Sequence, residues 1–224
     1  MYYKISEDLT CCDVDGHLVF LDIAQDRYFR LAHHLESEVR RSLASGSIPP
    51  QLCEQLAPRT TSADKDLGAC VLARIQPASL SALELPPANA IVRLNVEIII
   101  EVIVIVCWIH IRLRTRTLKS VINDAIAYKS KKRGRLEAMP TPENDVLHAA
   151  LRFIHARRYV PIEPTCLLDS LALLRFLSRR GFSANLVFAV TPEPFAAHCW
   201  IQSGDAVLNE TLSDANAHTP IRAI

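Results

Sequence analysis

The chain has 224 residues, of which 50% are hydrophobic and 22% are charged, so it can fold around one large core or two small ones. Its 25 basic and 24 acidic residues give a net charge of +1, which does not favour nucleic acid as a partner. Seven cysteines without a CxxC pair argue against a zinc ribbon and a disulfide-stapled secreted domain, and they predict a reduced, cytoplasmic protein.

The first 85 residues have the pattern of a small module in which strands precede helices. Three strand-like runs come first, with Asp15-Gly16 as a tight turn, at 11–14, 17–23 and 27–31. A helix carrying Leu35, Val39 and Leu43 follows and ends near Gly46, and two more helices are expected at 51–56 and 65–74. This pattern predicts a winged-helix-like domain of three strands and three helices.

Charge and proline content change near residue 85. Residues 1–85 carry 8 basic and 12 acidic residues, whereas residues 86–224 carry 17 basic and 12 acidic residues. Pro86 and Pro87 stand at the change, as they would in a linker. The sequence therefore predicts an acidic domain over 1–85 and a basic domain over 86–224.

The segment 91–111 is the one candidate for a membrane span. Its longest run without charged or strongly polar residues is eight residues, whereas a span needs about 20. The many isoleucines and valines favour a strand, but Arg93, Glu97 and Glu101 stand four residues apart and would line one face of a helix. We expect a helix in a protein that is not integral to the membrane.

Basic residues dominate the stretch from 112 to 135, which holds nine of them and one acid, Asp124. Such a run is typical of solvated helix faces, and it could also dock an acidic partner. A further amphipathic helix is predicted at 145–157.

A helix that begins at a cysteine is the most informative element. Thr165 is a suitable N-cap, leucines then recur at every third or fourth position, and Gly181 follows as a stop. Cys166 therefore lies at a helix N-terminus, where unpaired N–H groups and the helix dipole favour a thiolate. This position suggests a nucleophile, although most free cysteines are small buried hydrophobes.

A hairpin and a returning strand follow this helix, at 184–190, 196–202 and 206–210. His198 lies on the middle strand. A three-residue turn would place Glu210 opposite His198, and a two-residue turn at 203–204 would place Asn209 there. Either side chain could orient the imidazole as the third member of a cysteine triad does.

The order of these residues indicates the fold class. A cysteine that opens a helix, followed by a histidine and an acceptor on strands, is the layout of papain-like and transglutaminase-like α+β folds. Adjacent strand residues face opposite ways, so His198 and Cys199 are not expected to share a metal ion, and Cys199 is interpreted as packing. No metal site and no nucleotide motif is predicted.

Several motifs of the second part are similar to those of one family. They are Cys-Leu-Leu-Asp-Ser-Leu-Ala-Leu-Leu at 166–174, Gly-Phe-Ser-Ala at 181–184, Pro-Phe-Ala-Ala-His-Cys-Trp at 194–200 and Val-Leu-Asn-Glu at 207–210. They resemble the lasso-peptide maturation B proteins, which are transglutaminase-like cysteine peptidases. The resemblance implies that Cys166 is the nucleophile, His198 the base and Glu210 the acid, where the family usually has aspartate.

The first domain fits the same resemblance. Its segments 18–23 and 27–31 look like the PqqD-like element that captures a leader peptide as an added strand. Tyr28, Phe29 and Leu31 are the candidates near that groove. The family further implies two partners, a lasso precursor peptide bound through its leader and an ATP-dependent lasso cyclase. No cofactor is expected on this chain, and ATP enters only through the cyclase.

The resulting hypothesis is a cysteine endopeptidase that hydrolyses the leader–core junction of the precursor. One alternative is a catalytically inactive leader-binding scaffold or chaperone for the cyclase, because glutamate replaces the usual aspartate at position 210. The other is an acyl-transfer enzyme, since the same thioester can be given to an amine.

Overall fold

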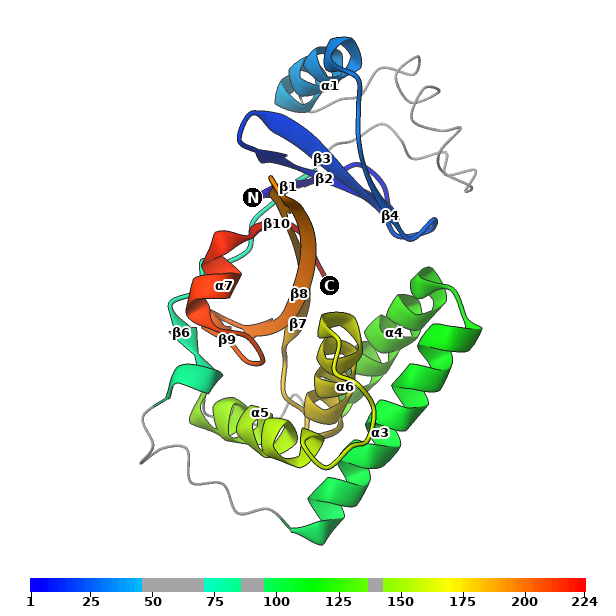
Figure 1. Ribbon diagram of the computed structural model, residues 1–224, viewed down its shortest axis with the longest axis vertical. Coiled ribbons are helices and arrows are strands. Elements are labelled where there is room, and N and C mark those ends of the chain that lie inside the picture. The colour runs from blue at the N-terminus through cyan, green and yellow to red at the C-terminus, as the bar shows by residue number, and fades with distance from the viewer. Residues whose placement is uncertain (46–70, 86–94, 137–142) are drawn as a thin grey trace.

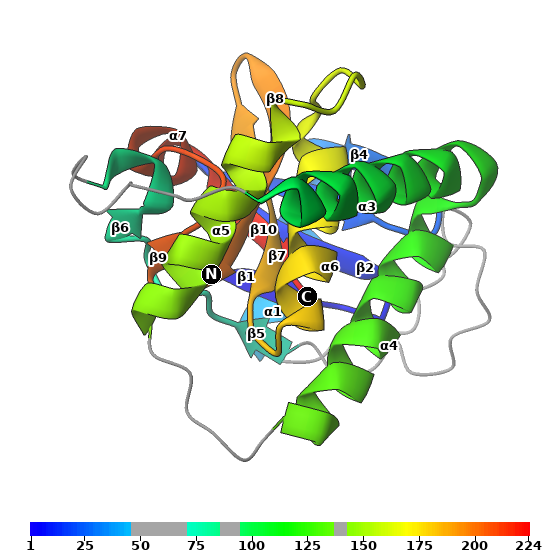
Figure 2. The same ribbon diagram turned by 90° about the horizontal axis from the view of Figure 1, so that it is seen from below.

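Two five-stranded sheets and a group of long helices make up the structure, a computed structural model that describes residues 1–45, 71–85, 95–136 and 143–224. In Figure 1, helix α1 lies above the first sheet, the second sheet lies below it, and α3 to α6 lie at the bottom. Figure 2 shows the helices from below, with α6 between α5 and α4. Both sheets and all these helices are therefore parts of one mixed α+β arrangement.

The first sheet has the strand order β4-β3-β2-β1-β5, and all its pairs are antiparallel. Asp15 and Gly16 have φ values of 50° and 82°, the left-handed conformation that a tight turn between β2 and β3 requires. Helix α1 follows β4. The bounds are β1 (Tyr2–Lys4), β2 (Leu9–Val14), β3 (His17–Asp22), β4 (Arg27–Arg30), β5 (Val71–Ala73) and α1 (His33–Ser45).

The three predicted strands and the first predicted helix are confirmed, but the sheet is larger than expected. Strand β1 was missed, and the expected helix at 65–74 is wrong over Val71–Ala73, which is a strand paired with β1. The ladder with β1 satisfies the backbone of this short apolar segment, which has too few residues for a stable helical face. The predicted helix at 51–56 lies outside the described residues.

The second sheet has the order β10-β7-β8-β9-β6, in which the β6–β9 pair is parallel. Its bounds are β6 (Leu80–Ser81), β7 (Asn185–Pro192), β8 (Phe195–Ser203), β9 (Ala206–Val207) and β10 (Thr219–Ala223). The predicted hairpin is confirmed as β7 and β8. Strand β6 belongs to this sheet although it precedes residue 85, and the domain division at that residue stays a prediction.

The helical layer confirms the predicted helices of the second part. The bounds are the 3-10 helix η2 (Ala82–Glu84), α3 (Val96–Thr115), α4 (Leu118–Leu136), α5 (Glu143–Arg157), α6 (Cys166–Arg179) and α7 (Leu212–Ala217). The apolar segment at 91–111 is helical from residue 96, and one face of α3 is buried in the core. Within the described ranges, no helix is long and apolar enough to cross a membrane.

Charged side chains of α3 and α4 contact other parts of the same chain. Glu101 pairs with Arg180, the C-cap residue of α6, at 2.6 Å. The ion pair expected along the face of Arg93, Glu97 and Glu101 involves Arg93, which lies outside the described residues. Arg112 pairs with Asp124. Within the basic stretch 112–135, intramolecular contacts therefore engage part of the charge, and docking of a partner there stays a prediction.

The two sheets pack against each other through one shared hydrophobic core. Val19 and Leu21 of β3 belong to the same buried cluster as Leu168 of α6 and Ile221 of β10. Polar contacts cross the same junction: Lys119 of α4 pairs with the buried Asp8 at 2.5 Å. The first sheet is therefore held in a fixed position against the helices and the second sheet.

Candidate active site

Cys166 is the first residue of α6, and the chain around it is held from both sides. Thr165 is the N-cap, and its hydroxyl oxygen accepts a hydrogen bond from the Leu168 N–H at 3.4 Å. Arg157 of α5 donates from Nε to Asp169 Oδ1 at 2.7 Å and from Nη2 to the Ile162 carbonyl at 2.8 Å. These bonds fix the start of α6, and Cys166 stays only half-buried.

Strand β8 brings His198 to the same place. His198 pairs with Ala189 in the β7–β8 hairpin. The Ser170 hydroxyl of α6 donates to the Cys199 carbonyl at 3.3 Å, which ties the strand to the helix one turn after Cys166. The hairpin and the helix thereby place the imidazole beside the thiol, and the two side chains form a hydrogen bond.

Glu210 contacts the far side of the imidazole. His198 Nε2 and Glu210 Oε2 are 2.5 Å apart, and each side chain keeps about a fifth of its surface exposed, 23% and 20%. Glu210 is itself held, because Oε1 accepts from the Thr211 N–H at 2.8 Å and its carbonyl accepts from the Ser81 hydroxyl at 2.6 Å. With Nε2 bonded to Glu210, Nδ1 is the ring nitrogen left for the thiol.

Both predicted hairpin registers are wrong, although one of them named the residue that reaches the histidine. The turn holds two residues, 204–205, because Ser203 pairs with Ala206, and β9 ends at Val207. Glu210 therefore approaches His198 from the segment after β9 and not from a paired strand. The sequence patterns did not show where the short strand ends.

Asn209, the alternative third residue, points elsewhere. Its Oδ1 accepts from the Ile201 N–H at 2.7 Å, and its Nδ2 donates to the Ser170 hydroxyl at 2.9 Å. Asn209 thus joins β8 to α6, and the structure does not bring its side chain to the imidazole.

The electrostatics of the site favour a charged pair. Hydrogen bonds from Cys199 and then His198 hold the pKa of Cys166 well below its usual value, against the opposing effect of burial. The hydrogen bond to Cys166 raises the pKa of His198 to about 9, with a further contribution from Glu210 and an opposing one from burial. At neutral pH the site therefore holds a thiolate beside an imidazolium.

Cys199 has a part in the site that the sequence interpretation missed. Its backbone N–H and its side chain both bond to Cys166, so the sulfur lies against the strand itself. The pKa of the Cys199 thiol is raised by the neighbouring Cys166 and by burial, which keeps its proton in place as a donor. The argument from alternating strand faces separated His198 from Cys199, but the Cys166 thiol bonds to both of these consecutive residues.

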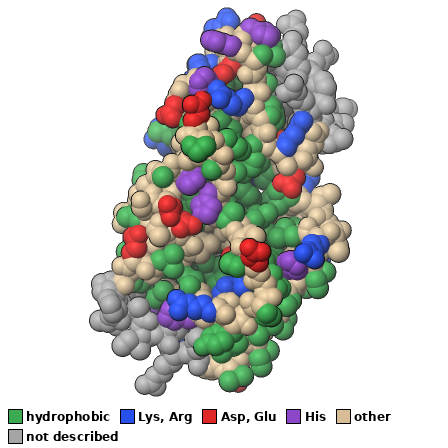
Figure 3. Space-filling view, viewed as in Figure 1, with side chains coloured by type: hydrophobic (Ala, Val, Ile, Leu, Met, Phe, Trp, Pro, Cys, Tyr) green, Lys and Arg blue, Asp and Glu red, His purple; other side chains and the backbone are tan. Residues whose placement is uncertain are grey.

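Two further rings surround the imidazole. The ring centroid of His218 lies 5.3 Å from that of His198, and the ring of Trp200 lies at 6.3 Å. Figure 3 shows histidine side chains beside the hydrophobic side chains that gather across the middle of the front face. Within the described ranges, no group of three or more His, Cys, Asp or Glu side chains is placed to hold a metal ion.

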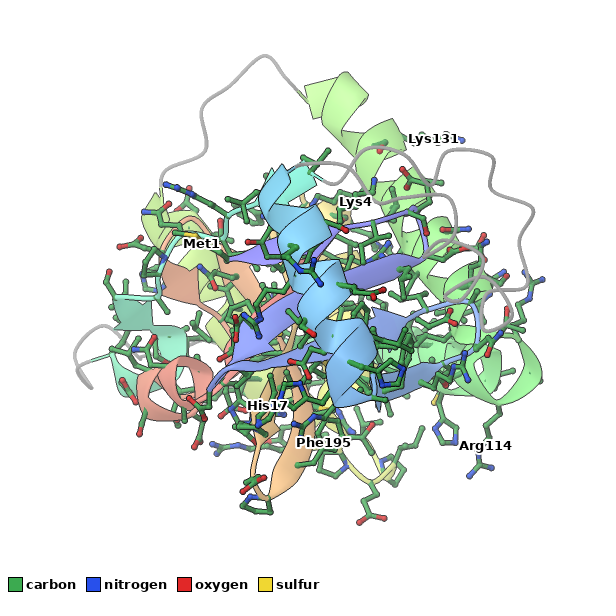
Figure 4. All side chains as sticks on the ribbon, turned by 90° about the horizontal axis from the view of Figure 1, so that it is seen from above. Met1, Lys4, His17, Arg114, Lys131 and Phe195 are labelled. Atoms are coloured by element: carbon green, nitrogen blue, oxygen red, sulfur yellow. The ribbon has the colours of Figure 1, made fainter. Side chains whose placement is uncertain are left out.

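The three predicted leader-binding residues, Tyr28 and Phe29 of β4 and Leu31 just after it, do not share one surface. The Tyr28 ring lies 5.8 Å from that of Phe195, which Figure 4 labels on the β7–β8 hairpin. Burial first, and then the neighbouring thiols of Cys199 and Cys166, raise the pKa of Tyr28, so this side chain borders the candidate active site. Phe29 stacks on Phe20 of β3 at 5.1 Å and packs with Leu31 in a separate cluster.

One protein-family model matches the part of the chain that contains the whole site. The model of the transglutaminase-like superfamily matches residues 106–223, more than half of the chain. The chain belongs to the transglutaminase-like superfamily. The matched region contains Cys166, His198 and Glu210, and members of this superfamily are typically cysteine-based enzymes.

A shorter segment of the chain is similar to one curated protein. The chain is 42% identical over 45 residues to the Microcin J25-processing protein McjB of Escherichia coli. The similar segment covers 20% of this chain and 22% of that protein, about a fifth of each. No solved structure matches the chain.

Proposed function

We propose that the protein is a cysteine endopeptidase that cuts a lasso precursor peptide between its leader and its core. The observation that carries the proposal is the hydrogen-bonded series of Cys166, His198 and Glu210 at the N-terminus of α6. The similarity to a Microcin J25-processing protein and the motifs shared with lasso-peptide maturation proteins support this substrate class.

The arrangement can perform hydrolysis through a thioester. The Cys166 thiolate attacks the carbonyl carbon of the junction, and the protonated His198 gives its proton to the departing amine as the C–N bond breaks. His198 then takes a proton from water, whose oxygen attacks the thioester and releases the carboxylate. Glu210 holds the imidazole and stabilises its charged form, and N–H groups at the start of α6 are candidates to bind the oxyanion.

In this proposal the first sheet holds the leader. Strand β4 forms one edge of that sheet, where an extended peptide can add as a further strand. Tyr28 on β4 borders the catalytic region, so a leader bound along β4 would direct its core towards Cys166. The freed core would pass to an ATP-dependent cyclase as partner.

The test is incubation of a lasso precursor with the wild type and with Cys166→Ala, with and without the cyclase and ATP, read by intact mass. Cys107 on α3 is half-buried and lies outside the site, so Cys107→Ala is the matched control. Without the cyclase, we expect the wild type and the control to give two fragments whose masses add to precursor plus water. Equal cutting by Cys166→Ala would refute the nucleophile. Binding without cutting by the wild type would indicate a scaffold, and an amine adduct would indicate acyl transfer.

A further inference from the structure

A cavity lies at the junction of the first sheet, α4 and β10, outside the Cys166 cluster. Its volume is about 280 Å³, which is enough for a small ion. In Figure 4, the labelled Lys4 on β1 and Lys131 on α4 lie on this side of the molecule. The cavity is lined by Tyr2, Lys4, Glu7, Thr10, Ile126, Lys129, Ser130, Arg222, Ala223 and Ile224.

The guanidinium of Arg222 is the main reason to expect a ligand in this cavity of about 280 Å³. Arg222 is only 8% exposed, and its Nη2 donates to the Glu7 carbonyl at 2.7 Å. Its Nε and Nη1 have no hydrogen-bond partner among the residues that the structure describes. A buried arginine normally has its N–H groups paired, because an unpaired buried charge is costly. Arg222 therefore has donor capacity that the protein itself does not use.

Thr10 of β2 repeats this observation in the same cavity. It is 1% exposed, and within the described part of the chain its hydroxyl oxygen has no hydrogen-bond partner. Thr10 belongs to the first sheet and Arg222 to the second, yet both line the same cavity. Two unsatisfied polar side chains that meet at one cavity indicate a polar ligand that bonds to both.

The charges around the cavity indicate the sign of that ligand. Lys4, Lys129 and Arg222 line it together with a single carboxylate, that of Glu7. Lys4 pairs with Glu7 at 2.5 Å, and Lys129 donates to the Asn185 amide oxygen at 2.7 Å. Because Lys4 offsets the charge of Glu7, the guanidinium of Arg222 leaves the lining with positive charge, which favours an anion.

We propose that this cavity is a binding site for a phosphate group. A phosphate carries up to two negative charges and several acceptor oxygens, and it can accept from a guanidinium, a hydroxyl and ammonium groups at once. A carboxylate has one charge and two oxygens, so it matches this set of donors less well. Bound phosphate would connect β2, β10 and α4, and it would strengthen the contact between the first sheet and the rest of the protein.

The experiment is calorimetric titration of the full chain with inorganic phosphate, with sodium acetate and sodium chloride at matched ionic strength as comparisons. We expect saturable binding of one phosphate per chain and weaker binding of acetate. Arg222→Met, which keeps an apolar side chain of similar length, should weaken phosphate binding by about tenfold or more, the effect of a lost charged hydrogen bond. Thr10→Val should weaken it by about three- to tenfold.

Arg152→Met is the matched control, because Arg152 is exposed on α5 and outside the cavity, and it should bind phosphate like the wild type. If Arg222→Met does not fold, Lys129→Gln provides the second variant and should also bind more weakly. The proposal is overturned by absence of saturable phosphate binding, by equal affinity for acetate, or by unchanged affinity in the cavity variants. The titration does not use peptidase activity, so its outcome is independent of the proposed function.

Discussion

The second sheet and α6 hold Cys166, His198 and Glu210 in a connected set of hydrogen bonds, whereas the first sheet presents an edge strand, β4, whose aromatic side chains pack on both faces. Hydrogen bonds join these three side chains in series and so fix their positions relative to one another. The first sheet ends in this edge strand, to which the proposed function assigns the leader peptide. The proposed function therefore gives the two regions separate tasks, with chemistry in one and substrate capture in the other.

Tyr28 is the point at which the two regions meet. It belongs to β4 of the first sheet, but its ring contacts Phe195 of the β7–β8 hairpin and its environment includes Cys166. Phe29, the next residue, faces the separate cluster under α1. Variants can therefore test whether the two tasks are separable.

The largest expected effect concerns His198, the proposed base. We expect His198→Ala to lower kcat/KM for precursor cleavage by about 10²- to 10⁴-fold, the usual contribution of a general acid–base group. His218→Ala is the matched control. The His218 ring lies 5.3 Å from the His198 ring, and its Nδ1 bonds to the Asp214 carbonyl, whereas His198 bonds to Glu210. The control variant should change kcat/KM by less than about tenfold. Equal losses in both variants would contradict the assignment of the base.

Glu210 and Asn209 are neighbours with different partners, and they form the second test. Glu210→Ala should lower kcat/KM by less than His198→Ala does, since the third triad residue contributes less than the nucleophile or base. It should also move the basic limb of the pH profile below its wild-type position near 9, because Glu210 helps to raise the pKa of His198.

Asn209→Ala should instead act on stability. It leaves the Ile201 N–H without its acceptor, so we expect the free energy of unfolding to fall by about 1–3 kcal/mol, measured by urea denaturation, with an unchanged pH profile. A shifted profile in Asn209→Ala together with a wild-type profile in Glu210→Ala would reverse the two roles.

The third test concerns Cys199 and the acid limb of the pH profile. A lowered Cys166 pKa means that the thiolate is present above that pKa and is lost as the pH falls through it. Cys199→Ala removes a donor, so the acid limb should move to higher pH by about one unit, the effect of one hydrogen bond to a charge. Cys199→Ser keeps a donor and should restore most of the shift. The same acid limb in all three proteins would show that Cys199 only fills space.

The smallest effects divide the two faces of β4. Tyr28→Ala should raise KM for the precursor by up to about tenfold, because it removes one aromatic contact beside the bound peptide. Phe29→Ala should mainly lower the free energy of unfolding, by about 2 kcal/mol, less than for a fully buried phenylalanine. Kinetics and urea denaturation of both variants check this division. Matching effects of the two variants on KM would show that both face the substrate.

The catalytic elements could be predicted because local signals define them. Thr165 before Cys166 indicated the helix start, and alternation around His198 indicated the strand. The contact between Glu210 and His198 could not be derived in the same way, because Glu210 lies beyond the end of β9, in a segment without a regular period. Cys199 was missed since its hydrogen bonds to Cys166 depend on how α6 meets β8.

The first sheet shows the opposite limit of sequence patterns. Its hairpins were predicted because Asp15-Gly16 is a strong turn signal. Val71–Ala73 joins the sheet only through pairing with β1, a partner about seventy residues earlier in the chain, and no local pattern contains that information. The same alternation rule separates Tyr28 from Phe29 and Leu31, which the family resemblance had grouped together.

The central claim is that Cys166 is a thiolate at neutral pH, and the pH dependence of its alkylation tests this most directly. The rate of iodoacetamide labelling at Cys166, followed by peptide mass, depends on the thiolate fraction and needs no peptide substrate. We expect rapid labelling at pH 6 to 7 in the wild type, and slower labelling at that pH in His198→Ala. Labelling of wild-type Cys166 that begins only above about pH 8, as for an ordinary thiol, would contradict the account.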